Sequence, residues 1–279
     1  MRRLLAAIDR LNVWRLWRQA GQGPVPRHLV LVIDCKTPGR PRSRPPRPRR
    51  RRARRSDRHR NARPGDESTG DQCADAERVE DLLVWSERAA IPIVSLFLLS
   101  ADSLKRLGPA ELPVLISGLE RHVKWLAEVS GRCGWQLRAI GRLELVPVEL
   151  RRALVDASHE TPATGRMLVQ LAIGYGGREE IVEALKHWAA RLEVTARPTL
   201  SEGLERLDPS DLTPYLYTGD APVPDLILRA GNEANLSGSV LWHCVHSNPC
   251  FLDLIWPEFQ EIDFLRALRT FQARELHIA

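Results

Sequence analysis

The sequence predicts an α/β fold, a single domain with a mainly parallel sheet that is flanked by helices. Short apolar runs of strand length alternate with amphipathic stretches of helix length along the chain. Such alternation is typical of a parallel sheet with helices packed on its faces. The 279 residues, 43% of them hydrophobic, are enough for one large domain with its own core.

The first expected element is an amphipathic helix over residues 1–22, which precedes the main domain at residues 27–279. Apolar residues recur in it at helical spacing, with arginines interleaved. The simpler interpretation is a helix packed on the domain. Because the helix is basic and carries Trp14 and Trp17, peripheral contact with an anionic membrane surface is the alternative.

From residue 27 onward, strands and helices are expected in alternation. The expected strands cover residues 28–34, 91–100, 136–140, 166–173, 225–228 and 239–245, and the expected helices cover 74–90, 109–129, 147–157, 174–192, 201–212 and 258–275. A polar loop, Arg229–Gly238, follows the fifth of these strands. In open α/β sheets the carboxyl ends of the strands bind ligands, and the Arg, Glu, Ser and Gly residues of this loop suit an anion.

An Arg/Pro-rich segment over residues 36–73 interrupts the domain. It lacks the large apolar side chains that would offset the entropy of ordering it, so we expect it to be disordered. It could form a self-repelling surface loop, or it could contact a polyanion such as nucleic acid or acidic lipid headgroups. Residues 40–63 alone contain 13 arginines and one acid. The rest of the chain is mildly acidic, so nucleic acid is not an expected partner of the domain.

The composition also bears on the compartment. Five scattered cysteines, an odd number, do not form a disulfide framework. No apolar run approaches the ~20 residues of a membrane span, and the N-terminus lacks the pattern of a signal peptide. We therefore expect a cytoplasmic protein, with membrane association through the N-terminal helix as the alternative.

Several motifs together resemble those of one enzyme family. In chain order they are PRHLVLVID, IPIVSLFLLSADSLKR, LAIGYGGREEIVEAL, PDLILR, LSG, LW, WPEF and DFLRAL. They are similar to the signatures of the cis-prenyltransferases, the undecaprenyl diphosphate synthase family. The resemblance covers most of the chain apart from the Arg-rich segment. It implies the cis-prenyltransferase fold, condensation of isopentenyl diphosphate with an allylic diphosphate, Mg²⁺ as cofactor, and a homodimer. The alternative assembly is a heterodimer with an active family member.

The resemblance also implies a set of site residues. Asp34 matches the catalytic, Mg²⁺-handling Asp at the end of the first strand. Arg229, Glu233 and Ser237 match residues of the isopentenyl diphosphate loop. Two adjacent diphosphates need a metal ion and several arginines to neutralise them, with donors aimed in advance at the leaving group.

Three departures from the family pattern leave the reaction open. The D-G-N-x-R-W-A cradle after Asp34 is absent. Asn235 stands where the second diphosphate-binding Arg belongs, and Asn248 stands where a magnesium-binding Glu belongs, so Asn248 is at most a weak metal ligand. Three functions fit this pattern: ordinary chain elongation, formation of an irregular or cyclised terpenoid from an allylic diphosphate, and a catalytically inactive subunit or pseudoenzyme with a degenerate active site.

Overall fold

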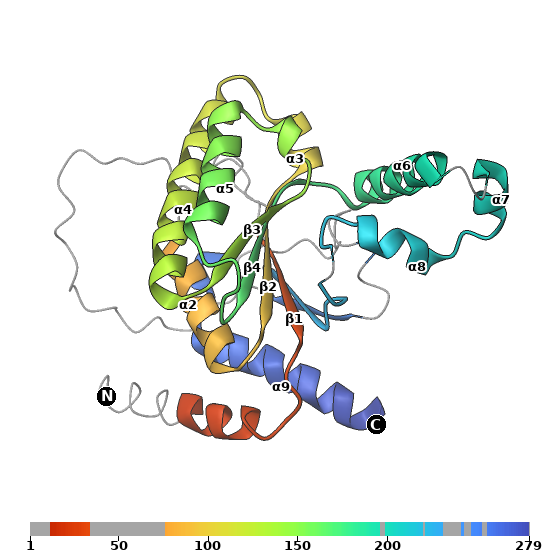
Figure 1. Cartoon of the computed structure of the whole chain (residues 1–279). Coiled ribbons are helices and arrows are strands. Elements are labelled where there is room, and N and C mark those ends of the chain that lie inside the picture. The colour runs from red at the N-terminus through yellow and green to blue at the C-terminus, as the bar shows by residue number, and fades with distance from the viewer. Residues whose placement is uncertain are drawn as a thin grey trace, which may run out of the picture.

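The computed structural model describes residues 12–33, 76–195, 199–219, 221–230, 241–242, 247–252 and 256–278. Its centre is a six-stranded sheet with the strand order β3-β4-β2-β1-β5-β6 (Figure 1). Each pair of neighbouring strands is parallel. The strands are β1 (His28–Val32), β2 (Ile93–Ser100), β3 (Gln136–Ile140), β4 (Leu168–Tyr175), β5 (Leu226–Ala230) and β6 (Asn248–Leu252). The predicted α/β fold with a mainly parallel sheet is confirmed.

The helices fall mostly where the amphipathic stretches predict them. They are α2 (Ala76–Arg88), α3 (Ala101–Arg106), α4 (Glu111–Cys133), α5 (Val148–Glu160), α6 (Gly177–Thr195), α7 (Leu200–Glu205), α8 (Pro209–Leu212) and α9 (Glu261–Ile278), with short 3₁₀ turns η1 (Leu143–Leu145), η2 (Thr213–Tyr215) and η5 (Trp256–Glu258). Residues 12–20 form a further helix. Among the helices in the described ranges, none has the length and apolar character that crossing a membrane requires.

The larger apolar core lies between one face of the sheet and helices α2, α4, α5 and α9 (Figure 1). All five residues of β1 are buried, which explains why this strand reads as a continuous apolar run rather than an alternating one. Leu29 and Leu31 face the helical layer, while Val30 and Val32 belong to a smaller cluster on the opposite face. Both faces of the central strand are therefore covered.

Residues 213–219 and 221–225 lie against the opposite face, and we call them the covering segment. This segment begins with η2 and is otherwise irregular. Its Tyr217 packs against the smaller cluster, which includes Phe97 and Tyr175. Helices α6, α7 and α8 extend away from the sheet just before this segment (Figure 1). They have an apolar cluster of their own around Trp188.

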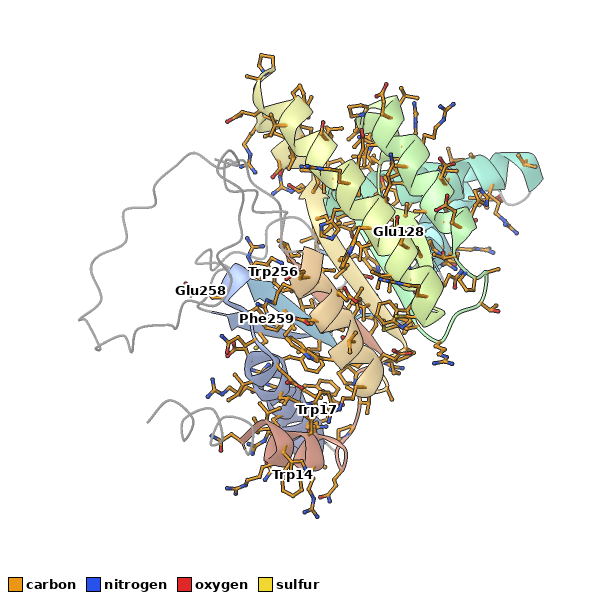
Figure 2. The ribbon with its side chains drawn as sticks, turned by 90° about the vertical axis from the view of Figure 1, so that its left-hand side faces the viewer. Trp14, Trp17, Glu128, Trp256, Glu258 and Phe259 are labelled. Atoms are coloured by element: carbon orange, nitrogen blue, oxygen red, sulfur yellow. The ribbon has the colours of Figure 1, made fainter. Side chains whose placement is uncertain are left out.

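The helix of residues 12–20 packs on the domain, as the simpler interpretation predicts. Val13, Leu16 and Trp17 pack against the larger core (Figure 2). The indole Nε1 of Trp17 donates a hydrogen bond to Glu261 Oε1 at 2.7 Å. The Arg88 guanidinium lies 4.1 Å from the Trp17 ring centroid. The remaining residues of the predicted helix, 1–11, lie outside the described part of the chain.

Some expected elements differ from the observed ones. The sequence pattern missed β6: the expected strand was 239–245, yet Leu241 and Trp242 form a turn, and its other residues lie outside the described ranges. The expected helix 201–212 is two helices, because α7 begins at a capping box at Thr199 and α8 at a second one at Asp208. The Arg/Pro-rich segment 36–73 also lies outside the described residues, and its disorder stays a prediction.

Candidate active site

The topology identifies one crevice where a ligand is expected to bind. The chain leaves β1 toward β2 on one side and leaves β5 toward β6 on the other, although β1 and β5 are neighbours. Two neighbouring strands whose connections run in opposite directions open a crevice at their carboxyl ends, the usual ligand site of open α/β sheets. In this chain that crevice lies between the end of β1 and the end of β5.

Arg229 lies at this crevice. It is paired with Val32, the last residue of β1, and is 4% exposed. The sequence pattern predicted it as the first loop residue, but the structure places it within β5, where the backbone ladder fixes its position. Since side chains alternate along a strand, Arg229 shares a face with Ile227, which belongs to the smaller cluster. A buried guanidinium at such a crevice is suited to bind an anion.

The structure describes few of the other predicted site residues. Asp34 lies outside the described residues, one position after Ile33, and so do Glu233, Asn235 and Ser237. The backbone of Asn248 is described: it pairs with Leu226, at the amino end of β5. Arg229 pairs with Phe251, three residues further along. The register therefore separates the Asn248 and Arg229 positions by about 10 Å along the strand axis. The role of Asn248 as a metal ligand stays a prediction.

The end of β2 contributes a capped helix to the same edge of the sheet. Ser103 donates its backbone N–H to Ser100 Oγ at 3.0 Å, which caps α3. Ser103 is buried, whereas Asp102 is exposed and lies 3.8 Å from Lys105 Nζ. Ser103 therefore maintains the turn, whereas Asp102 faces solvent.

A buried carboxylate in the first turn of α6, next to the end of β4, was not predicted from the sequence. Glu180 is fully buried and accepts hydrogen bonds from the Tyr175 hydroxyl and from the Tyr217 backbone N–H. Burial, and then the adjacent Glu180 carboxylate, raise the pKa of Tyr175 well above its usual value. Burial raises the pKa of Tyr217 to about 12. Glu180 lies one turn into α6 within the motif GYGGREE, and an acid at that position is usually a solvated helix-start residue.

An exposed ion pair links α6 to α3 beside this carboxylate. Lys105 Nζ lies 3.0 Å from Glu179 Oε1, and the hydrogen bond lowers the pKa of Glu179. Gly174, near the end of β4, has a φ of +63°, and a Cβ there would lie 2.7 Å from the Arg142 carbonyl oxygen. A residue with a side chain would therefore separate the ends of β3 and β4.

The covering segment is held against the sheet by a buried polar chain. His28 Nδ1 lies 2.7 Å from the Pro222 carbonyl oxygen, and His28 Nε2 lies 2.8 Å from Ser95 Oγ. Ser95 donates to Gln170 Oε1, and Gln170 Nε2 donates to the Thr218 carbonyl at 3.3 Å. Three side chains from neighbouring strands thus hold two carbonyls of the covering segment. This chain tethers the covering segment to β1, β2 and β4.

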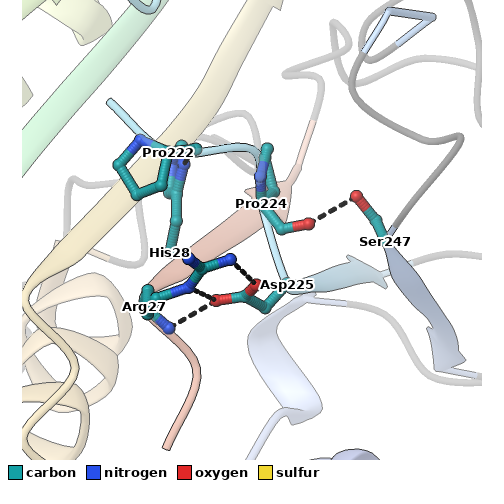
Figure 3. A network of polar contacts seen from close by, with 6 residues as sticks. All are labelled: Arg27, His28, Pro222, Pro224, Asp225 and Ser247. Atoms are coloured by element: carbon teal, nitrogen blue, oxygen red, sulfur yellow. Dashed lines mark hydrogen bonds and ion pairs between the residues drawn. The ribbon is translucent and has the colours of Figure 1, made fainter. Parts of the chain in front are cut away.

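At the amino edge of the sheet, further polar contacts join β1 to β5 and β5 to β6 (Figure 3). Arg27 donates its backbone N–H and its guanidinium to the Asp225 carboxylate, with Nη2 and Oδ1 3.0 Å apart. Ser247 Oγ donates to the Pro224 carbonyl. These contacts lie at the end opposite Arg229, so their role is to fix the strand register.

The described residues contain no group of three His, Cys, Asp or Glu side chains arranged to hold a metal ion. Asp34, the expected magnesium ligand, is outside those residues. As an ionised carboxylate it suits a hard cation, whereas the amide of Asn248 is a weaker donor. Of these two expected protein ligands, only Asp34 is a good match for magnesium. Mg²⁺ is commonly completed by substrate phosphates and water.

Comparison with known proteins agrees with this geometry. Residues 57–279 match the Prenyltransf family model, described as undecaprenyl diphosphate synthase. An isoprenyl transferase of Thermus thermophilus is 36% identical, over 99% of this chain and 98% of the relative. A (2Z,6E)-farnesyl diphosphate synthase of Thermobifida fusca is 36% identical, over 96% and 95%.

A solved structure shares the fold. Lavandulyl diphosphate synthase from Lavandula x intermedia, solved with dimethylallyl diphosphate, has a TM-score of 0.67 and 25% identity, over 89% of this chain and 95% of that one. The parallel sheet, the crevice beside Arg229 and these matches lead to one conclusion: the chain belongs to the undecaprenyl diphosphate synthase family, the cis-prenyltransferases.

Proposed function

We propose that this protein is a prenyltransferase that acts on an allylic isoprenoid diphosphate. It either condenses this substrate with isopentenyl diphosphate or converts it into an irregular or cyclised terpenoid. The irregular product is an alternative because Asn235 stands where the family pattern has a second diphosphate-binding arginine. The structural relative that makes lavandulyl diphosphate also supports that alternative.

The observation that carries the proposal is the buried Arg229 beside the end of β1. A leaving diphosphate gains negative charge as its bond to carbon breaks, and a preorganised guanidinium stabilises that charge more than water does. Because Arg229 is fixed within a strand, it does not need to reorganise during the reaction. Glu233 and Ser237, further along the same loop, are proposed to complete the diphosphate site together with Asn235.

Magnesium is proposed as the cofactor, with Asp34 as its main protein ligand and Asn248 as a weak one. When bound, the ion would supply charge neutralisation of the diphosphate. The chain's own contribution is to hold the diphosphate at Arg229 and to exclude water beneath the covering segment. We further propose a cytoplasmic homodimer, with a heterodimer with an active family member as the alternative assembly.

The direct test is an activity assay on the purified full chain. The protein is incubated with Mg²⁺ and labelled geranyl or farnesyl diphosphate, with and without isopentenyl diphosphate. Longer products only when isopentenyl diphosphate is present would support condensation. Cyclised products or alcohols from the allylic diphosphate alone would support the irregular reaction. Unchanged substrate from a folded protein would overturn the proposal and favour the inactive-subunit alternative, suggested by Asn235 and Asn248.

Two variants link the activity to the proposed site. Arg229→Lys keeps the charge but loses the bidentate fork, so the KM for the diphosphate is expected to rise about tenfold or more. Arg266→Gln is the matched control, because this arginine is exposed on α9. Equal kinetics for both variants, with both folded by circular dichroism, would show that Arg229 does not bind substrate.

A further inference from the structure

Two tryptophans one turn apart in the helix of residues 12–20 have opposite environments (Figure 2). Trp17 is held by Glu261, by Arg88 and by the Phe264 ring, whose centroid is 6.2 Å away. Trp14 projects from the outer side of the helix and is 54% exposed. Among the exposed large hydrophobic side chains of the described residues, Trp14 is the only aromatic one.

The inward face of this helix is sufficient to hold it on the domain. Val13, Leu16 and Trp17 pack on the core, and Ala20 is buried. Gln272 of α9 also donates to the Ala20 carbonyl at 2.8 Å. Trp14 contributes to none of these contacts, so its exposure is not a by-product of docking the helix.

The outward face combines this tryptophan with positive charge. Arg15 and Arg18 are exposed beside it, and the Arg18 guanidinium lies 5.1 Å from the Trp14 ring centroid. Residues 1–22 contain five arginines against one acid, Asp9. Surface helices that carry aromatic residues among arginines bind at the headgroup level of bilayers, where anionic lipids attract the charges.

We propose that Trp14, Arg15 and Arg18 form a docking surface for an anionic lipid bilayer. The helix lies near the amino end of β1, whereas the crevice at Arg229 lies at the carboxyl ends of the strands (Figure 1). The docked protein keeps that crevice away from the bilayer plane. The proposal goes beyond the proposed function and does not depend on catalysis, because it concerns binding alone.

Vesicle partitioning of the full chain tests the surface. Sedimentation is measured with phosphatidylcholine vesicles, with and without phosphatidylglycerol, for the wild type, for Arg15→Gln/Arg18→Gln and for Trp14→Ser. The matched control is Arg151→Gln/Arg152→Gln, which removes the same charge from exposed positions on α5. Each arginine at an anionic surface contributes about fivefold to partitioning, so Arg15→Gln/Arg18→Gln is expected to lose roughly 30-fold. The control pair should lose much less, and Trp14→Ser should also weaken binding.

Residues 40–63 keep all 13 of their arginines in every variant, so their own attraction to the vesicles cancels in these comparisons. Partitioning that is equal in all variants would assign the binding to other residues and overturn the proposal.

A second readout reports on Trp14 itself. Fluorotryptophan-labelled protein gives fluorine NMR signals, and the Trp14 signal is assigned by its loss in Trp14→Phe. With spin-labelled anionic vesicles the Trp14 signal is expected to broaden, while the signal of the fully buried Trp135 stays sharp. A sharp Trp14 signal from vesicle-bound protein would refute insertion of this side chain.

Discussion

Removal of the Tyr175 hydroxyl is expected to destabilise the protein even though nothing else about the side chain changes. Tyr175 is 1% exposed, and its ring packs edge-on against Phe97 with the ring centroids 4.6 Å apart. Tyr175→Phe keeps this packing and removes one donor from the buried Glu180 carboxylate. A hydrogen bond to a charged group contributes about 1.5–3 kcal/mol, so the free energy of unfolding should fall by that amount.

Substitution of Glu180, the acceptor of this hydrogen bond, should lower the free energy of unfolding further. Glu180→Ala leaves the Tyr175 hydroxyl and the Tyr217 backbone N–H without their acceptor. Each buried donor left unpaired costs about 1–3 kcal/mol, so the variant should lose about 2–6 kcal/mol. Glu180→Gln keeps the shape and an acceptor oxygen, and it should lose less than Glu180→Ala.

Urea unfolding followed by circular dichroism measures both effects. In a double-mutant cycle, Tyr175→Phe combined with Glu180→Ala should lose less stability than the sum of the single changes, by about 1.5–3 kcal/mol. Tyr215→Phe is the matched control, because this half-buried tyrosine packs beside α6, and it should change stability by less than about 0.5 kcal/mol. A coupling energy below about 0.5 kcal/mol would refute the assignment of Glu180 as the acceptor that joins β4 to the covering segment.

Three further outcomes are expected. Trp17→Phe loses the indole N–H that donates to Glu261, so the free energy of unfolding should fall by about 1.5–3 kcal/mol. Trp14→Phe should leave the free energy of unfolding unchanged, because Trp14 is exposed. Equal effects of the two variants in urea unfolding would contradict the description of this helix. His28→Phe leaves Ser95 and the Pro222 carbonyl without their buried partner, so amide hydrogen exchange should accelerate more in the covering segment than in β4. Equal acceleration in both would show that His28 does not hold the covering segment on the sheet. The pKa of Tyr217 is raised to about 12, so the folded state keeps a phenol proton that the unfolded state loses near pH 10. The stability that this group contributes is therefore fully present below pH 10 and is lost as the pH rises toward 12. In urea titrations at a series of pH values, Tyr217→Phe should reduce this loss.

The fold was largely predictable from the sequence because its strands are buried on both faces. The runs HLVLV and IVSLFLLS have few polar interruptions, and helical periodicity marks the long helices. β6 was missed because its residues, NPCFL, include a proline and an asparagine, which are rare in strands. It is the last strand of the sheet, where proline is tolerated.

Of the candidate site, only the place of Arg229 could be anticipated from the sequence, because its motif puts it at the end of a buried strand. Its role in binding a diphosphate stays a prediction. Glu180 could not be anticipated, because its burial depends on Tyr175 and Tyr217, and Tyr217 lies 37 residues further along the chain. The same holds for Gln170, whose partner Thr218 is 48 residues away. Such polar pairs are formed by the tertiary fold and leave no local periodicity in the sequence.

The position of β1 in the middle of the sheet has a consequence for biosynthesis. One of the two neighbours of β1, the strand β5, begins at Leu226, close to 200 residues further along the chain. At about 5–20 residues per second, the unpaired side of β1 waits about 10–40 s on the ribosome for that neighbour. The N-terminal helix waits longer still, since Trp17 and its acceptor Glu261 are 244 residues apart. The helix of residues 12–20 therefore docks only after α9 has been made, and the open edge of β1 must be shielded from other nascent chains until β5 has emerged.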